Sequence, residues 1–218
     1  MNAPPRSSSA GLRRIGVLGG SFDPVHLGHL RLARLARRRF QLDRVYFLPA
    51  RRPWHKPRPQ ADFHHRFAML ALALCGLDWA VPAALPDRGR PSFTWDELAW
   101  VHLRHPRARL FFLLGADAFH DLPHWHKFPA LLDRCDWIVA HRGSLPLSAT
   151  EVVPAAWLRQ TRRQGLRLRH SSVWWLPRFN QPFSSSGIRR LARARSLSGL
   201  SQSLPPRVAE YALRAGLY

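Results

Sequence analysis

Short apolar runs recur along the chain and alternate with longer segments whose apolar residues follow helical spacing. Short apolar runs bounded by turn residues are typical of strands that are buried on both faces. We therefore predict strands at residues 15–18, 44–49, 79–85, 109–115, 137–140 and 172–176. The run at 109–115 is the clearest, because its interior is apolar throughout and it ends in glycine.

Helical patterns separate these runs. Leu and Ala recur at helical spacing over 30–37, and an apolar face follows Asp62, a residue that can cap the helix predicted at 62–75. Further helices are predicted at 95–103, with Thr94 or Ser92 as the cap, around 152–163, from 184, and from 205 to near Gly216. Alternating strands and helices favour parallel pairing with right-handed connections. The predicted fold is therefore Rossmann-like and α/β, a doubly wound, mainly parallel sheet of about six strands flanked by helices.

The pattern favours one main domain over residues 14–218, with a variable insertion at 144–170 and a helical C-terminal part at 184–218. Residues 1–13 are rich in Pro, Ser and Ala and lack the apolar stretch of a signal peptide, so we expect a disordered tail. No apolar run approaches the roughly 20 residues that span a bilayer. Cys75 and Cys135 lie in apolar, helical contexts and are expected to be buried thiols in a reducing cytoplasm.

The formal net charge of +21 permits either a nucleic-acid-binding protein or an enzyme that acts on polyanionic nucleotides. The arginines are spread along the whole chain, and Lys56 and Lys127 are the only lysines. Such an Arg excess looks like a compositional bias. The aromatic residues form no recognisable RNA-binding pattern, so we expect no specific nucleic-acid partner.

The first residues that could bind a ligand follow the first predicted strand. Gly19 and Gly20 form a turn between that strand and a helix, and the unpaired N–H groups of a helix start bind phosphate. His26 and His29 are three residues apart, so within a helix they share a face, and Gly28 leaves room for a ligand beside them. Without the surrounding motif, the two histidines could also be ordinary residues at a helix start or half of a metal site.

Two other segments fit phosphate or ligand binding. Residues 183–190 place three serines and then Arg189 at the start of a helix, a second phosphate-binding arrangement. The basic, proline-rich loop 50–61 follows a strand's carboxyl end, where open α/β sheets bind ligands, although a solvated linker would have the same composition.

Four blocks resemble a known family. Residues 19–29, Gly-Gly-Ser-Phe-Asp-Pro-Val-His-Leu-Gly-His, are similar to the H-x-G-H motif of the nucleotidyltransferase superfamily. A second block of that superfamily is similar to Phe-Ser-Ser-Ser-Gly-Ile-Arg at 183–189. Two further blocks resemble bacterial nicotinate-nucleotide adenylyltransferases in particular. They are Arg88 with Pro-Ser-Phe-Thr at 91–94, and Leu-Gly-Ala-Asp at 114–117 with Trp125 and Ile-Val-Ala-His-Arg at 138–142. Phe93, Phe183 and Ser186 depart from the family pattern without removing a charged group.

The resemblance implies transfer of the adenylyl group of ATP to nicotinate mononucleotide, giving deamido-NAD and pyrophosphate in NAD biosynthesis. It implies catalytic roles for His26, His29 and Arg189, and Mg²⁺ held by substrate phosphates rather than by protein ligands. The implied ATP-binding residues are Gly19, Gly20, Ser21, Phe22, His26, Gly28, His29, Gly115, Asp117, Ser185, Ser186, Ile188 and Arg189. The implied acceptor-binding residues are His55, Lys56, Thr94, Trp125 and Arg142, with the Trp125 ring stacked on the pyridine.

Other interpretations stay open at this point. Nicotinamide mononucleotide or phosphopantetheine could be the acceptor in the same chemistry, and a basic nucleic-acid-binding protein or an inactive relative would belong to another class. The sequence predicts no membrane partner, and homo-oligomerisation stays open.

Overall fold

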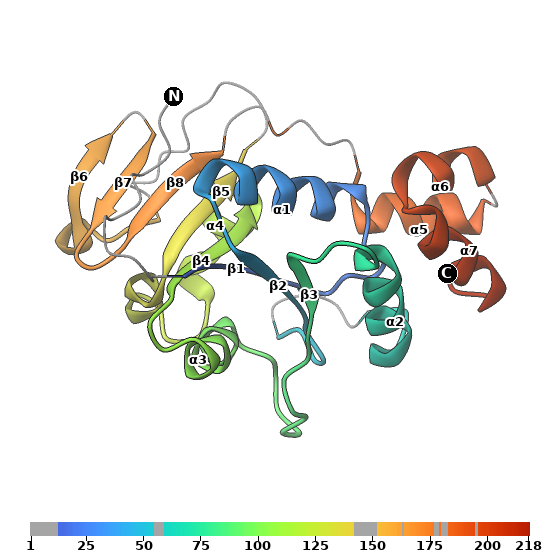
Figure 1. Ribbon diagram of the computed structural model, residues 1–218, viewed down its shortest axis with the longest axis horizontal. Helices are drawn as coiled ribbons and strands as arrows, with labels where there is room; N and C mark the ends of the chain where they lie inside the picture. The colour runs from blue at the N-terminus through green and yellow to red at the C-terminus, as the bar shows by residue number, and fades with distance from the viewer. Residues whose placement is uncertain are drawn as a thin grey trace.

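The computed structural model describes residues 13–54, 59–141, 152–162, 164–176, 179, 183–194 and 196–218. The tail predicted at 1–13 therefore lies outside the described residues except for Arg13, as do His55, Lys56 and Arg142. One sheet forms the centre of the molecule, with eight strands in the order β3-β2-β1-β4-β5-β8-β7-β6 (Figure 1).

Six of these strands are parallel, and they correspond to the six that the apolar runs predict. They are β1 (Arg14–Gly20), β2 (Arg44–Pro49), β3 (Ala80–Pro82), β4 (Arg109–Gly115), β5 (Asp136–Ala140) and β8 (Ser172–Leu176). The strand order reverses between β1 and β4, which is the doubly wound arrangement of a Rossmann-like fold. The predicted fold class is confirmed, but the number of strands is eight, not six.

The two further strands correct the prediction for the insertion. Instead of a helix around 152–163, the chain forms the short 3₁₀ helix η4 (Ala155–Trp157) and then β6 (Leu158–Arg162), which pairs antiparallel with β7 (Gly165–Leu168). Residues 159–161 are exposed, so this segment has no apolar helical face to bury. Gly165 fits the hairpin because a Cβ there would lie 1.8 Å from the Val173 carbonyl oxygen.

Helices cover both faces of the sheet and extend from one end (Figure 1). They are α1 (Leu27–Phe40), α2 (Phe63–Leu74), α3 (Thr94–Arg104), α4 (Ala116–His120), α5 (Ser185–Arg193), α6 (Leu197–Ser203) and α7 (Pro206–Arg214), with the 3₁₀ helices η1 (Leu122–His124) and η2 (Ala130–Arg134). Asp62 caps α2, as predicted, by accepting the N–H of His65. Neither Ser92 nor Thr94 caps α3: Phe93 occupies the N-cap position, and no side chain makes the capping hydrogen bond.

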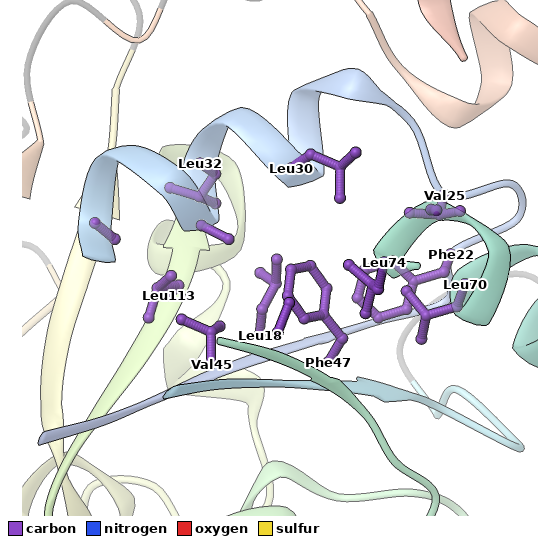
Figure 2. Packing of buried hydrophobic residues seen from close by; sticks show 14 of the residues in the cluster. Leu18, Phe22, Val25, Leu30, Leu32, Val45, Phe47, Leu70, Leu74 and Leu113 are labelled. Atoms are coloured by element: carbon purple, nitrogen blue, oxygen red, sulfur yellow. The ribbon is translucent and has the colours of Figure 1, made fainter. Parts of the chain in front are cut away.

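The core consists of two apolar clusters, one on each face of the sheet, because successive strand residues point to opposite sides. On the face covered by α1, Leu18 and Phe47 of the sheet pack beneath Leu30, with Leu70 of α2 beside them (Figure 2). On the other face, Leu98 of α3 belongs to a cluster with residues of β4 and β5.

The two cysteines differ in solvent exposure. Cys135 is buried, and burial raises the pKa of its thiol, whereas Cys75 is exposed at the end of α2, so the prediction that Cys75 is buried was wrong. Within the described ranges, no helix combines the length and apolar character that a membrane span requires.

Two identical substitutions test the core. Leu70 is 0% exposed and Leu103 is 77% exposed, and both lie in helices. We expect Leu70→Ala to lower the free energy of unfolding by about 2–5 kcal/mol, because it removes buried methyl groups and leaves a cavity. Leu103→Ala is expected to stay within about 0.5 kcal/mol of the parent. Urea unfolding measures both, and equal losses would contradict the packing described above.

Candidate active site

An open cleft of about 700 Å³ lies at the carboxyl ends of β1 and β4, where the strand order reverses. Open α/β sheets bind ligands at this point. The cleft brings together most of the residues singled out from the sequence: Gly19, Gly20, Ser21, Phe22, His26, His29, Thr94, Gly115, Asp117, Trp125, Ser185, Ser186 and Arg189.

Two predicted residues do not line the cleft. Gly28 is buried in the first turn of α1, where its N–H is donated to His26, and Ile188 is buried in the core beneath α5. Both therefore support the cleft from behind. His55, Lys56 and Arg142 lie outside the described residues.

Gly19 and Gly20 are the last residues of β1, not the turn predicted there, and the turn to α1 follows at residues 21–26. A Cβ on Gly19 would lie only 2.6 Å from Oε2 of Glu97, so a side chain at this position would force the Glu97 carboxyl group to move. Phe22 follows with φ of 47°, and its buried ring contacts the edge of the His29 ring at a centroid distance of 4.9 Å. The backbone of the turn is thus held between α3 and α1.

The two histidines form a reciprocal capping arrangement at the start of α1. His26 is the N-cap residue rather than part of the helix, and its Nδ1 accepts the N–H of Gly28 at 3.1 Å. Nδ1 of His29 accepts the N–H of His26 at 3.2 Å, and the two rings lie 3.8 Å apart. An Nδ1 that accepts has no proton, so in both rings Nε2 has the proton and acts as a donor.

Burial sets the charge of His26. The side chain is 7% exposed, and desolvation lowers its pKa from 6.5 to about 4. At neutral pH, His26 is therefore an uncharged hydrogen-bond donor.

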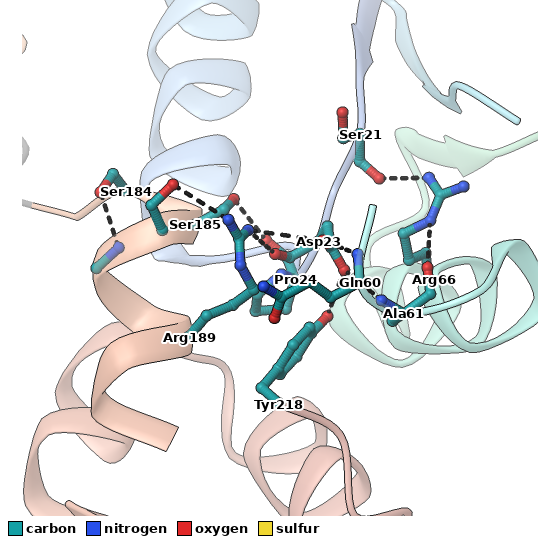
Figure 3. Close-up of polar contacts among 12 residues, drawn as sticks. Ser21, Asp23, Pro24, Gln60, Ala61, Arg66, Ser184, Ser185, Arg189 and Tyr218 are labelled. Atoms are coloured by element: carbon teal, nitrogen blue, oxygen red, sulfur yellow. Dashed lines mark hydrogen bonds and ion pairs between the residues drawn. The ribbon is translucent and has the colours of Figure 1, made fainter. Parts of the chain in front are cut away.

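The positive charge comes from α5. Arg189 donates to the backbone oxygen of Asp23 at 2.8 Å and lies 3.6 Å from its carboxylate (Figure 3). Ser184 caps α5 by accepting the N–H of Gly187, and the hydroxyl of Ser185 donates to the Pro24 carbonyl. The cap, hydroxyl groups and arginine of this helix start therefore face the turn after β1.

Sequence reasoning missed two polar residues that support the turn. The buried Asp23 carboxylate accepts the N–H groups of Gln60 and Ala61 and the phenol of Tyr218. Arg66, 1% exposed, donates to the Ser21 carbonyl at 2.6 Å. The sequence signal for Arg66 was the presence of an arginine within the apolar helix α2. The neighbouring sequence gave no signal for the partners of Asp23.

The opposite end of the cleft is aromatic. Trp125 is largely buried, donates its indole N–H to Asp121 at 3.3 Å, and meets Phe112 edge to face at 6.1 Å. Thr94 lies across from it in the first turn of α3. Ser92, just before, accepts the N–H groups of residues 51 and 52, which fixes the loop after β2 to this end.

Glu97 is a further residue of this end that the sequence analysis missed. It lies three residues after Thr94 and next to Leu98 on the buried face of α3, which was the available signal. Desolvation, with a smaller contribution from Asp96, raises the pKa of Glu97 to about 8. Its carboxyl group is therefore mostly protonated at neutral pH.

No group of three or more His, Cys, Asp or Glu side chains gathers as a metal centre within the described residues. The end of the cleft that contains His26, His29, Ser185, Ser186 and Arg189 offers imidazole N–H, hydroxyl and guanidinium donors, which fit phosphate oxygens rather than a bare cation.

Comparison with known proteins shows the family of the chain. A model of the cytidylyltransferase-like family matches residues 17–191. A probable nicotinate-nucleotide adenylyltransferase of Bordetella petrii is 40% identical over 209 residues, covering 95% of this chain and 100% of the relative. The chain belongs to the nicotinate-nucleotide adenylyltransferase family.

Other members of the family are similar over nearly the same length. The probable nicotinate-nucleotide adenylyltransferase of Aeromonas hydrophila is 37% identical, covering 94% of this chain and 96% of the relative. Among solved structures, Plasmodium falciparum nicotinic acid mononucleotide adenylyltransferase complexed with NaAD has a TM-score of 0.74 at 19% identity, covering 94% of this chain and 97% of that one. This likeness confirms the Rossmann-like fold, and the family membership makes the chain a nucleotidyltransferase.

The burial of His26 predicts a pH dependence of stability. Because its folded-state pKa is about 4 and its ordinary value 6.5, the unfolded state takes up a proton first on acidification, and stability is lost as the pH falls from 6.5 towards 4. Between pH 7 and pH 5 this amounts to about 2 kcal/mol.

His26→Asn isolates this effect, because asparagine keeps an N-cap acceptor and does not titrate. Urea unfolding at pH 7 and pH 5 is expected to show a smaller acid loss in the variant than in the parent by that amount. Equal acid losses would mean that His26 titrates normally in the folded protein.

Proposed function

We propose that this protein transfers the adenylyl group of ATP to nicotinate mononucleotide, releasing pyrophosphate and forming nicotinate adenine dinucleotide. One observation supports this most directly: a single cleft combines a phosphate-binding end, with His26, His29 and Arg189, and an aromatic end, with Thr94 and Trp125. The names of the relatives agree, as do the Plasmodium structures complexed with NaAD and with APC.

The reaction needs positioning more than acid–base chemistry. An oxygen of the acceptor phosphate, already an anion, forms a bond to the α-phosphorus of ATP, and the bond from that phosphorus to the bridging oxygen of pyrophosphate breaks. The electron pair leaves with pyrophosphate, so no side chain has to remove a proton. Catalysis then depends on alignment and on donors that meet the developing charge.

The chain supplies these donors from two helix starts. His26 and His29 donate from Nε2, with the backbone of Gly19 to Ser21 beside them, to oxygens of the triphosphate. Ser185, Ser186 and Arg189 bind the β- and γ-phosphates from α5, and Gly115 and Asp117 bind the adenosine. When bound with the triphosphate, Mg²⁺ would neutralise part of its charge, and no residue of the chain is assigned to hold it.

At the other end, Thr94 and the backbone near Trp125 bind the nicotinate carboxylate, and the indole ring stacks on the pyridine. His55, Lys56 and Arg142 are proposed, from the family resemblance, to contact the acceptor phosphate. We place the reaction in the cytoplasm, which fits the two free cysteines.

Acceptor choice tests this function directly. The purified protein is incubated with ATP, Mg²⁺ and either nicotinate mononucleotide, nicotinamide mononucleotide or phosphopantetheine, and pyrophosphate release is measured. We expect the highest kcat/KM with nicotinate mononucleotide. A higher value with another acceptor, or no release with any of them, would contradict the proposed function.

His29→Ala tests the transition-state donor. We expect kcat to fall by about 10²-fold or more, because one donor to the developing charge is lost. His102→Ala is the matched control, since His102 is exposed on α3 and lies outside the cleft. An unchanged kcat in folded His29→Ala would remove His29 from this role.

A further inference from the structure

Glu97 lies at the aromatic end of the cleft and is buried, at 5% exposure. It also lines a second cavity of about 120 Å³, so the residue borders both spaces. Family resemblance gave this residue no role.

Neighbouring contacts place the carboxyl group. Its Oε2 lies 2.6 Å, and a ring carbon of Phe112 3.2 Å, from the point where a Cβ on Gly19 would be. The Phe112 ring in turn meets the Trp125 ring edge to face at 6.1 Å. The carboxyl group of Glu97 therefore lies beside the end of β1, and the Phe112 ring that contacts Trp125 approaches the same position.

Charged residues lie near Glu97, but none that the structure describes forms an ion pair with it. Within the described part of the chain, no ion pair involves Glu97, and Arg90 instead pairs with Asp96 at 2.9 Å. The other titratable or charged groups that line the two cavities are Arg51, Asp87, Arg88, Arg90 and Asp96 in the second cavity, and Asp23, His26, His29, Asp117, Asp121 and Arg189 in the cleft.

A neutral carboxyl group in this position differs chemically from a carboxylate. It has one O–H donor, which can bind an anionic group, while a carboxylate there could only accept and would repel an anion. In a water-poor pocket this difference discriminates strongly between an acceptor with a carboxylate and one with a carboxamide.

We propose that Glu97 is a specificity-determining residue of the acceptor site, and that its protonated carboxyl group donates a hydrogen bond to the pyridine carboxylate of nicotinate mononucleotide. This assignment rests on the function proposed above. Its consequence is that preference for the anionic acceptor is lost when Glu97 ionises, whereas use of the neutral carboxamide is retained.

The test is the pH dependence of a ratio. We measure kcat/KM for nicotinate mononucleotide and for nicotinamide mononucleotide from pH 6.5 to pH 9.5 and divide the first by the second. The two acceptors share their ribose and phosphate, so titration of those groups, of ATP and of the histidines affects both and cancels in the ratio. With a pKa of about 8 for Glu97, the ratio is expected to fall about tenfold between pH 7 and pH 9.

Two variants separate hydrogen bonding from packing. Glu97→Gln keeps the shape and a neutral N–H donor at every pH, so its ratio is expected to be independent of pH. Glu97→Leu keeps the bulk without a donor, so it should lower kcat/KM for the nicotinate acceptor at every pH and leave the other acceptor nearly unchanged. Far-UV circular dichroism confirms that each variant is folded.

Asp96→Asn serves as a matched control one residue away. It removes the neighbouring like charge, so the ratio should still fall with pH but begin to fall at a lower pH than in the parent.

A ratio that is flat with pH in the parent protein would overturn the role of Glu97 even if no variant folds. A Glu97→Gln ratio that falls as steeply as the parent's would also overturn it. Turnover with nicotinate mononucleotide in either case would leave the proposed function standing. No turnover with either acceptor would instead contradict the proposed function, and the assignment of Glu97 would fall with it.

Discussion

The buried carboxylate of Asp23 connects the parts of the chain on which the cleft depends. It accepts two backbone N–H groups, from Gln60 and Ala61, and the phenol O–H of Tyr218, and Arg189 lies beside it. A buried charge is costly unless donors surround it, so these contacts are effectively obligatory. They hold the turn after β1, the approach to α2, the start of α5 and the last residue of the sequence in one arrangement. Burial and the charge of Asp23 raise the pKa of Tyr218, which keeps its phenol a donor.

Near the Asp23 carboxylate, the cleft contains two kinds of hydrogen-bond donor, one neutral and one positively charged. His26 is uncharged because burial lowers its pKa, and its Nδ1 is occupied by a backbone N–H, which fixes the proton on Nε2. The fixed positive charge is that of Arg189, on a helix start from the other end of the sequence. Donors whose orientation is set before the substrate arrives need no reorganisation during the reaction. The same principle applies at the aromatic end, where burial keeps Glu97 protonated.

Much of the fold could be predicted because parallel strands buried on both faces give continuous apolar runs, as in 109–115. The edge hairpin of β6 and β7 could not, since residues such as Arg159 and Gln160 are exposed and give neither an apolar run nor a helical face. The helix α6, with the sequence Leu-Ser-Gly-Leu-Ser-Gln-Ser, was missed for a similar reason.

The site shows the same division between local and distant signals. The position of the glycines at the end of the first strand, of His26 and His29, and of the serines before Arg189 could be predicted, because strand ends and helix starts leave local patterns. The glycines end β1 rather than form the turn. The roles of Asp23, Arg66 and Glu97 could not, because their partners are distant in sequence. Asp23 and Tyr218, for example, are 195 positions apart.

The most direct test of this account is a crystal structure of the protein with a non-hydrolysable ATP analogue and Mg²⁺. The account predicts the triphosphate in the cleft at the ends of β1 and β4, with its oxygens within hydrogen-bonding distance of Nε2 of His26 and His29 and of the Arg189 guanidinium. A triphosphate bound elsewhere, with neither histidine in contact with phosphate, would contradict it.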